Sequence, residues 1–108
     1  MQAPQVPMSS SPTLAVDDMV GFWRIRPQSG AAFCLIALNR DEKAGGYGVH
    51  IETCAVPVLS SAVDWRPVSG GFELRGKSGV LVARFQMIDV DHFASAEAGY
   101  RMERAPVS

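Results

Sequence analysis

The sequence lacks a strong charge of either sign. Ten Lys and Arg residues nearly balance eleven Asp and Glu residues among 108, which leaves a formal net charge of −1. No run of basic residues stands anywhere along the chain. Because nucleic-acid-binding proteins carry clustered positive charge, this balance argues against a nucleic-acid partner.

Long apolar runs are also missing. The longest one, Ala31–Leu38, falls far short of the roughly 20 residues that a helix needs to span a bilayer. Met1–Pro12 has neither a charge nor an apolar block, so it does not resemble a signal peptide. We therefore expect a chain that does not span a membrane and that is either cytosolic or freed of its signal before Met1.

Cysteine and histidine are scarce, with two of each. Cys34, Cys54, His50 and His92 match no common zinc-binding spacing, and we expect neither a metal nor a cofactor. The two cysteines could be a buried free thiol pair or a disulfide. Closing a loop of this size would stabilise the fold by about 3 kcal/mol and would indicate an oxidising compartment.

The sequence also shows no residue pattern typical of a catalytic site. Ser60, Ser61 and Ser78 lie in predicted loops and turns, and none occupies a nucleophile elbow. The candidate bases His50 and His92 are better explained as ordinary strand residues. Acid–base pairs at a workable spacing are not evident, and we expect no enzyme activity.

Two short motifs superficially resemble ligand sites. Gly76-Lys77-Ser78-Gly79 has the look of a phosphate loop, but it lacks the upstream glycine and the following helix, so we predict a hairpin turn. Asp89-Val90-Asp91 would place two carboxylates on one face of a strand. The other oxygen ligands of a calcium site are not evident, which favours a solvated face.

The feature that dominates the sequence is an alternation of apolar and polar residues with a period of two, which predicts strands. Turn residues separate about eight short segments, and this spacing is typical of a sandwich or a small up-and-down barrel. A closed barrel is favoured because closure removes exposed edges. The predicted strands are Phe22–Arg26, Ala31–Leu38 (buried on both faces), Tyr47–Glu52, Val63–Val68, Phe72–Arg75, Val80–Met87, Ile88–Ala94 and Gly99–Glu103, with Asn39–Gly46 as a hairpin loop.

The N-terminal part differs in character. Met1–Thr13 contains prolines and a serine run, and it predicts an extended arm or a disordered tail. Leu14–Val20 predicts a short helix that Thr13 caps and Gly21 ends. The domain division is thus an arm over residues 1–13 and one barrel over residues 14–105.

The two tryptophans, Trp23 and Trp65, are the largest apolar side chains. Their strand positions predict a place in the barrel core. The alternative is a ligand pocket lined by both, because a small barrel can hold one ligand.

A set of motifs in fixed order resembles the bacterial alkaline metalloprotease inhibitors of the Inh type, which inhibit secreted serralysin-like zinc proteases. The motifs run from Gly21-Phe22-Trp23 through Cys34-Leu35-Ile36-Ala37-Leu38, Cys54, Trp65-Arg66-Pro67 and Gly71-Phe72-Glu73-Leu74 to Gly79 and Phe85. The resemblance covers roughly residues 9–104 and is fairly specific as a set. The same domain is similar to the C-terminal part of some outer-membrane lipoproteins of rhizobia-like bacteria.

The resemblance implies an eight-stranded, lipocalin-like antiparallel barrel, a Cys34–Cys54 disulfide and a periplasmic or secreted location, with possible association with the outer membrane. It also implies inhibition by obstruction. The protease-binding arm would be Ser9, Ser10, Ser11, Pro12 and Thr13, which would enter the protease cleft while barrel loops hold its rim. Met1–Met8 precede this segment, so the Ser9 nitrogen meets a zinc ion only if processing frees it.

We therefore expect a monomeric inhibitor of a secreted zinc metalloprotease. Two other functions stay open from the sequence. One is a structural or interaction domain of the cell envelope, for which Met1–Pro12 would be a linker. The other is a small-ligand carrier with a cavity between Trp23 and Trp65.

Overall fold

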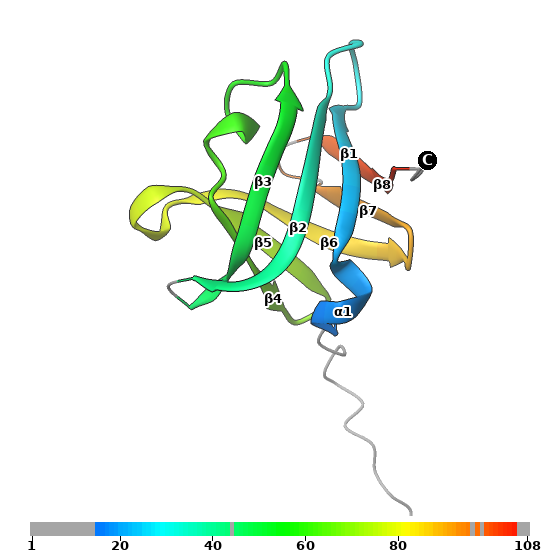
Figure 1. The fold of residues 1–108 in the computed structure, drawn as a ribbon. Helices are drawn as coiled ribbons and strands as arrows, with labels where there is room; N and C mark the ends of the chain where they lie inside the picture. Colours follow the sequence, from blue (N-terminus) through cyan, green and yellow to red (C-terminus); the bar gives the residue numbers. More distant parts are fainter. Residues whose placement is uncertain (1–14, 44, 96, 98, 106–108) are drawn as a thin grey trace, which may run out of the picture.

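The computed structural model describes residues 15–105 except 44, 96 and 98. The described elements are α1 (Val16–Met19), β1 (Gly21–Pro27), β2 (Cys34–Lys43), β3 (Gly46–Cys54), η1 (Leu59–Ser61), β4 (Asp64–Val68), β5 (Gly71–Arg75), η2 (Lys77–Gly79), β6 (Leu81–Asp89), β7 (His92–Ser95) and β8 (Tyr100–Arg104) (Figure 1).

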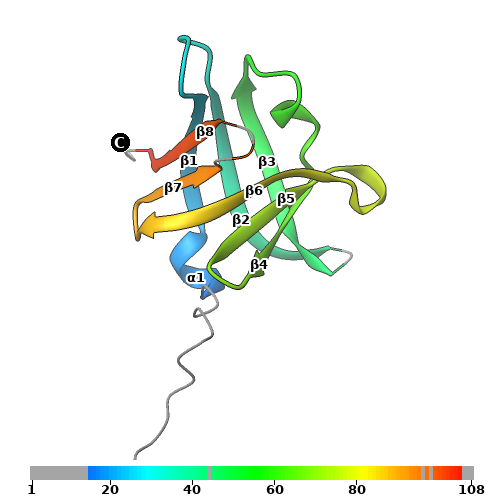
Figure 2. The same ribbon diagram turned by 180° about the vertical axis from the view of Figure 1, so that it is seen from behind.

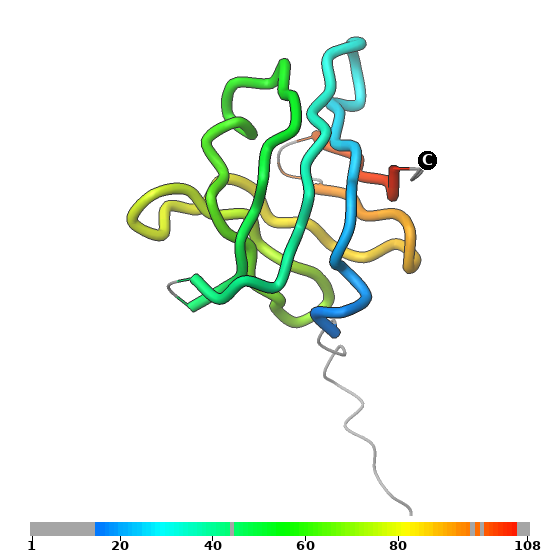
Figure 3. The backbone as a smooth tube through the Cα atoms, in the orientation of Figure 1, coloured from blue at the N-terminus to red at the C-terminus, as the bar shows by residue number. Residues whose placement is uncertain are grey.

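Within the described residues, the strands form one closed antiparallel barrel in the order of the chain. Each strand pairs with the next, and β8 pairs with β1 through a register that sets Arg104 opposite Trp23. Figure 3 follows the chain once around this barrel. The predicted all-β, eight-stranded antiparallel barrel with a short N-terminal helix is confirmed.

An up-and-down barrel places successive connections at alternate ends. We call the end where α1 leads into β1 the arm end, and it also carries the β2–β3, β4–β5 and β6–β7 connections. The remaining connections lie at the other end, which we call the disulfide end for its Cys34–Cys54 bond. The two views in Figures 1 and 2 show α1 attached at the base of β1, away from the β1–β2 loop.

The core follows from alternation along each strand. In β1, Trp23 and Ile25 are fully buried, whereas Arg24 and Arg26 point outward. The same alternation runs through β2, where Cys34, Ile36 and Leu38 are buried and the residues between them are partly exposed. The prediction that Ala31–Leu38 is buried on both faces is therefore wrong, because the strand begins at Cys34 and turns only one face inward.

Aromatic rings fill the middle of the barrel. Trp23 meets Phe93 with ring centroids 5.5 Å apart, Phe93 meets Phe72 at 5.3 Å, and Phe72 meets Trp65 at 6.1 Å. Side chains thus occupy the space between the two tryptophans, where a ligand carrier would need a cavity.

Two strand boundaries differ from the sequence prediction. The β2 strand continues to Lys43, and the predicted loop Asn39–Gly46 is mostly strand. Its polar residues project from the barrel after a register shift between Leu38 and Glu42, so they resemble a loop in composition while keeping strand pairing. The β6 strand likewise runs on to Asp89 instead of giving way to a new strand at Ile88.

A glycine is required at position 71, because two neighbouring strands approach each other closely there. It opens β5, and a Cβ atom at this position would collide with the carbonyl oxygen of Phe85 on β6. Only glycine lets the two backbones lie so near each other.

Candidate functional site

The arm end brings together α1 and the β6–β7 turn, which lie far apart in the sequence. The predicted binding segment, Ser9–Thr13, falls outside the described residues, and the first described element after it is the place where the N-terminal chain joins the barrel. This place is α1, whose first residue is Val16.

The helix α1 is a single turn that cannot hold itself in place. It has four residues, and Ala15 at its N-cap position makes no side-chain hydrogen bond. Isolated helices are marginal even at about 12–15 residues. The position of α1 must therefore come from contacts with the barrel.

The sequence prediction for this helix needs correction. The helix starts at Val16 rather than Leu14, and Ala15 rather than Thr13 occupies the N-cap position. It ends at Met19, because Val20 is already extended and Gly21 is the first residue of β1, with φ of +135°. The described chain thus forms one helical turn before the barrel begins.

Contacts from two strands anchor α1. The Met19 side chain is 1% exposed, and the indole N–H of Trp23 donates a hydrogen bond of 2.9 Å to the Met19 carbonyl oxygen. On the outer side, Arg40 of β2 forms an ion pair with Asp17. Trp23 therefore connects the buried core to α1, which we call the root of the arm because the N-terminal arm precedes it in the chain.

Arg104, the last residue of β8, adds a third anchor. Its guanidinium lies 4.2 Å from the centroid of the Trp23 ring. Its Nη2 donates to the carbonyl oxygens of Asp18 at 2.8 Å and Val90 at 3.3 Å, and its Nε donates to Asp91 at 2.8 Å. No pattern in the sequence marks this residue, because its role depends on barrel closure bringing β8 beside β1.

The last residues of β6 and the turn that follows it expose apolar side chains. Ile88 is 58% exposed and Val90 is 57% exposed, and we call this pair the apolar tip. Val20, directly after α1, is also exposed. Exposed apolar side chains that gather on one part of a surface are typical of an interaction site.

An exposed pair of charges shapes the same turn. The Asp89 carboxylate lies 2.7 Å from Nδ1 of His92. This hydrogen bond raises the pKa of His92 above its ordinary value and lowers the pKa of Asp89. Asp91 faces Arg104 instead, so the prediction that Asp89 and Asp91 share one face of a strand is wrong: β6 ends at Asp89, and Asp91 belongs to the turn.

The remaining candidate catalytic residues do not converge. His50 points outward from β3, with Nε2 3.3 Å from Glu52. Ser60 and Ser61 lie in η1, where each hydroxyl donates to a backbone carbonyl three residues earlier. Ser78 lies in the short η2 connection between β5 and β6, in the left-handed region, as expected for a turn between two strands.

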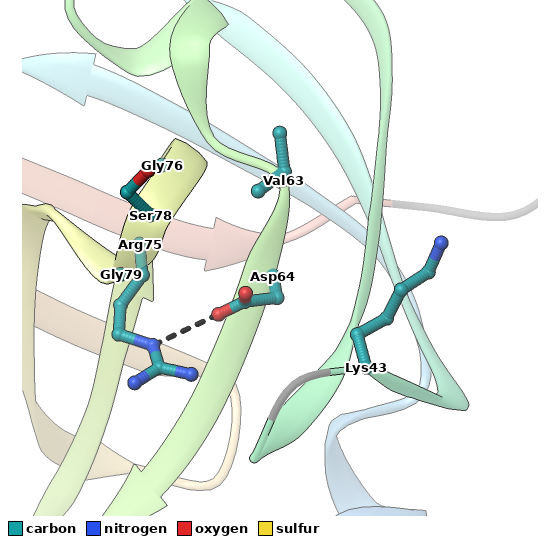
Figure 4. Close-up of a pocket in the computed structure, with 7 residues that line it drawn as sticks. All are labelled: Lys43, Val63, Asp64, Arg75, Gly76, Ser78 and Gly79. Atoms are coloured by element: carbon teal, nitrogen blue, oxygen red, sulfur yellow. Dashed lines mark hydrogen bonds and ion pairs between the residues drawn. The ribbon is translucent and has the colours of Figure 1, made fainter.

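A surface pocket of about 560 Å³ lies on the outer wall of the barrel. Figure 4 shows Arg75 and Asp64 facing each other across it, while Lys43 extends away from them. The Arg75 Nε donates to Asp64 at 2.9 Å, and both side chains are largely buried. This ion pair links β4 to β5, so we assign Asp64 and Arg75 a structural role and assign the pocket no ligand.

The comparison with known families decides the assignment. A family model described as "Protease inhibitor Inh" matches residues 13–103. The chain belongs to the Inh family of protease inhibitors. No curated protein matches its sequence.

The cysteines of this Inh-family chain form a disulfide. Cys34 opens β2, Cys54 closes β3, and the two residues are paired directly across the ladder. Of the two interpretations open from the sequence, the disulfide is confirmed and the free thiol pair is wrong. Disulfides persist in oxidising compartments, which points away from a reducing cytosol.

Two kinds of feature are absent from the described part of the Inh-family chain, residues 15–105 except 44, 96 and 98. Among these residues no helix has the length and apolar character that crossing a bilayer requires. No three His, Cys, Asp or Glu side chains of the described part come together as a group that could hold a metal ion.

Proposed function

We propose that this Inh-family chain inhibits a secreted zinc metalloprotease of the serralysin type. Residues 9–13 enter the protease cleft, and the arm end of the barrel rests on the rim of that cleft. The chain acts by obstruction and performs no catalysis. Its location is periplasmic or secreted, in keeping with the disulfide.

One observation carries the proposal beyond family membership. The helix that leads into the barrel is a single turn, yet it is held by the indole of Trp23, the guanidinium of Arg104 and an ion pair to Arg40. A leading segment with no binding role would not require these contacts. A leading segment that must enter a narrow cleft gains affinity when its base is already fixed.

The reach of the segment suits this role. Five residues extend at most about 17 Å, which is enough to enter a cleft from a barrel docked at its mouth. Pro12 restricts the backbone to an extended form and so lowers the cost of ordering on binding.

The apolar tip offers a second contact. The carbonyl oxygen of Val90 bonds the same Arg104 side chain as the Asp18 carbonyl oxygen of α1, so we expect a protease that accepts the arm to meet this turn and its exposed apolar tip as well. Rim contacts of this kind add affinity without entering the cleft.

The test is an inhibition assay on the full-length chain. We expect tight inhibition of a serralysin-type zinc protease and a loss of at least about a hundredfold when residues 9–13 are all replaced by glycine, since five ordered residues lose their contacts. The matched control replaces residues 2–6 by glycine and should leave inhibition unchanged. Full inhibition by the 9–13 variant would remove the arm from the mechanism.

The protease class needs its own control. A serine endopeptidase assayed in parallel should not be inhibited. Inhibition of the serine enzyme alone would refute the assignment to zinc proteases while leaving the Inh family membership intact.

A further inference from the structure

The guanidinium of Arg104 joins three separate parts of the molecule. It stacks on Trp23 of β1, bonds the Asp18 carbonyl of α1, and bonds both the Val90 carbonyl and the Asp91 carboxylate of the β6–β7 turn. The side chain is 31% exposed, so the cluster lies at the surface of the arm end and is partly shielded from water.

The carbonyl groups at the end of a helix have no partners within the helix. In α1 these include the carbonyls of Asp18 and Met19, which receive hydrogen bonds from Arg104 and Trp23. The two donors come from opposite ends of the sequence and meet only because β8 closes on β1. The placement of α1 is therefore set by the closed barrel.

We infer that Arg104 is the positioning residue that fixes the root of the inhibitory arm to the β6–β7 turn, so that the arm and the apolar tip meet the protease as one rigid unit. The inference rests on the proposed function. Arg104 itself need not touch the protease, because it acts through α1 and Val90.

The chemistry of arginine suits this task better than that of lysine. A guanidinium presents a planar fork of donors that can bond several acceptors at fixed angles and still stack on an aromatic ring. Lysine keeps the charge but offers a single ammonium group. R104K should therefore hold α1 less firmly, and R104M should release it while its apolar stem still covers Trp23.

Rigidity at this point affects binding through entropy. If α1 moves freely, the protease must order both the arm and its base on binding, and the ordering cost rises. We expect R104M to weaken inhibition by roughly tenfold and R104K by a smaller factor.

Arg24 provides a matched control. It too pairs with a carboxylate, Glu103 at 3.1 Å, and lies 5.8 Å from the centroid of an aromatic ring, that of Phe33. Neither Glu103 nor Phe33 belongs to α1 or to the β6–β7 turn. R24M thus removes a similar set of contacts without releasing the arm root.

The experiment compares full-length parent, R104M, R104K and R24M proteins. Amide hydrogen exchange is followed by NMR at Asp18, whose N–H bonds the Ala15 carbonyl at 3.1 Å inside α1. The inhibition constant is measured against the zinc protease. We expect faster exchange and weaker inhibition in R104M, intermediate values in R104K, and parental values in R24M.

A double-variant cycle separates positioning from general destabilisation. When residues 9–13 are already glycine, R104M should cause no further loss of inhibition, because there is no functional arm to position. An equal loss in both backgrounds, or unchanged Asp18 exchange in R104M, would overturn the inference.

Failure of the proposed function gives a different result. If the parent protein does not inhibit the zinc protease, the proposed function falls and the arm-positioning role falls with it, whatever the exchange data show. If the parent inhibits through residues 9–13 but R104M matches it, only the role of Arg104 is refuted.

Discussion

The disulfide end of the barrel carries a covalent cross-link, whereas the arm end is held together by tryptophan and arginine side chains. At the disulfide end, a covalent link joins the start of β2 to the end of β3. At the arm end, side chains donate hydrogen bonds to main-chain carbonyls: Trp23 to Met19, Trp65 to Asn39, and Arg104 to Asp18 and Val90.

The difference separates two tasks. A disulfide limits the freedom of the unfolded chain and so raises stability, wherever it lies. Side-chain bonds to carbonyl groups fix the position of a particular loop or helix in the folded state. Under the proposed function, the disulfide end mainly keeps the barrel folded, and the arm end presents chain segments to the protease.

The largest expected effect concerns the disulfide end. Replacing Cys34 and Cys54 together by alanine should lower the free energy of unfolding by about 3 kcal/mol, because the unfolded chain regains the freedom that the closed loop removed. Urea unfolding monitored by tryptophan fluorescence measures the change. Inhibition should persist wherever the variant remains folded, and a specific loss of inhibition in a folded variant would contradict the separation of tasks.

The next effect compares an exposed apolar residue from each end. Ile88 at the apolar tip is 58% exposed, and Val80 beside η2 is 62% exposed. I88S should weaken inhibition roughly tenfold through loss of an apolar contact with the protease, whereas V80S should leave it unchanged. Titration of protease activity with each variant provides the measurement. Equal effects of the two substitutions would show that the apolar tip has no special role.

The smallest effect concerns the Asp89–His92 pair in the β6–β7 turn. The pKa of His92 is raised above 6.5 mainly by its hydrogen bond to Asp89, with further attraction from Asp91 and Glu103. Its contribution to stability is present below about pH 6.5 and is lost as the pH rises through the raised pKa. The pKa of Asp89 is lowered below 3.8, so its contribution is lost as the pH falls through that lowered value.

The pair should therefore support the turn between about pH 4 and pH 6.5. NMR titration of the His92 ring protons should show a higher pKa in the parent protein than in D89N. An unchanged His92 pKa in D89N would mean that the hydrogen bond does not order this turn.

Much of the barrel could be predicted from the sequence, because alternation along a strand is a local signal. Strands β1 and β3 through β5 appear within a few residues of their predicted bounds, and the burial of Trp23 and Ile25 follows from the same alternation. The prediction was weaker for Asn39–Lys43. Those polar and charged residues are typical of a loop, and only the pairing of this segment with β3 shows that it continues a strand.

The anchorage of the arm could not be predicted in this way. Arg104 and Asp18 are separated by 86 positions, and no local pattern distinguishes this arginine from its neighbours. Only ring closure brings them together. The binding segment Ser9–Thr13 was predicted from a family resemblance, and its role stays a proposal.

Closure of the barrel has one more consequence. Within the described chain every strand has a partner on both sides, so no strand offers an unpaired edge. Proteases hold their substrates as extended chains, and pulling one strand into a cleft would break two ladders of hydrogen bonds at once. We therefore expect the paired strands of the barrel to resist cleavage by a protease that the chain contacts, as a direct consequence of the closed topology.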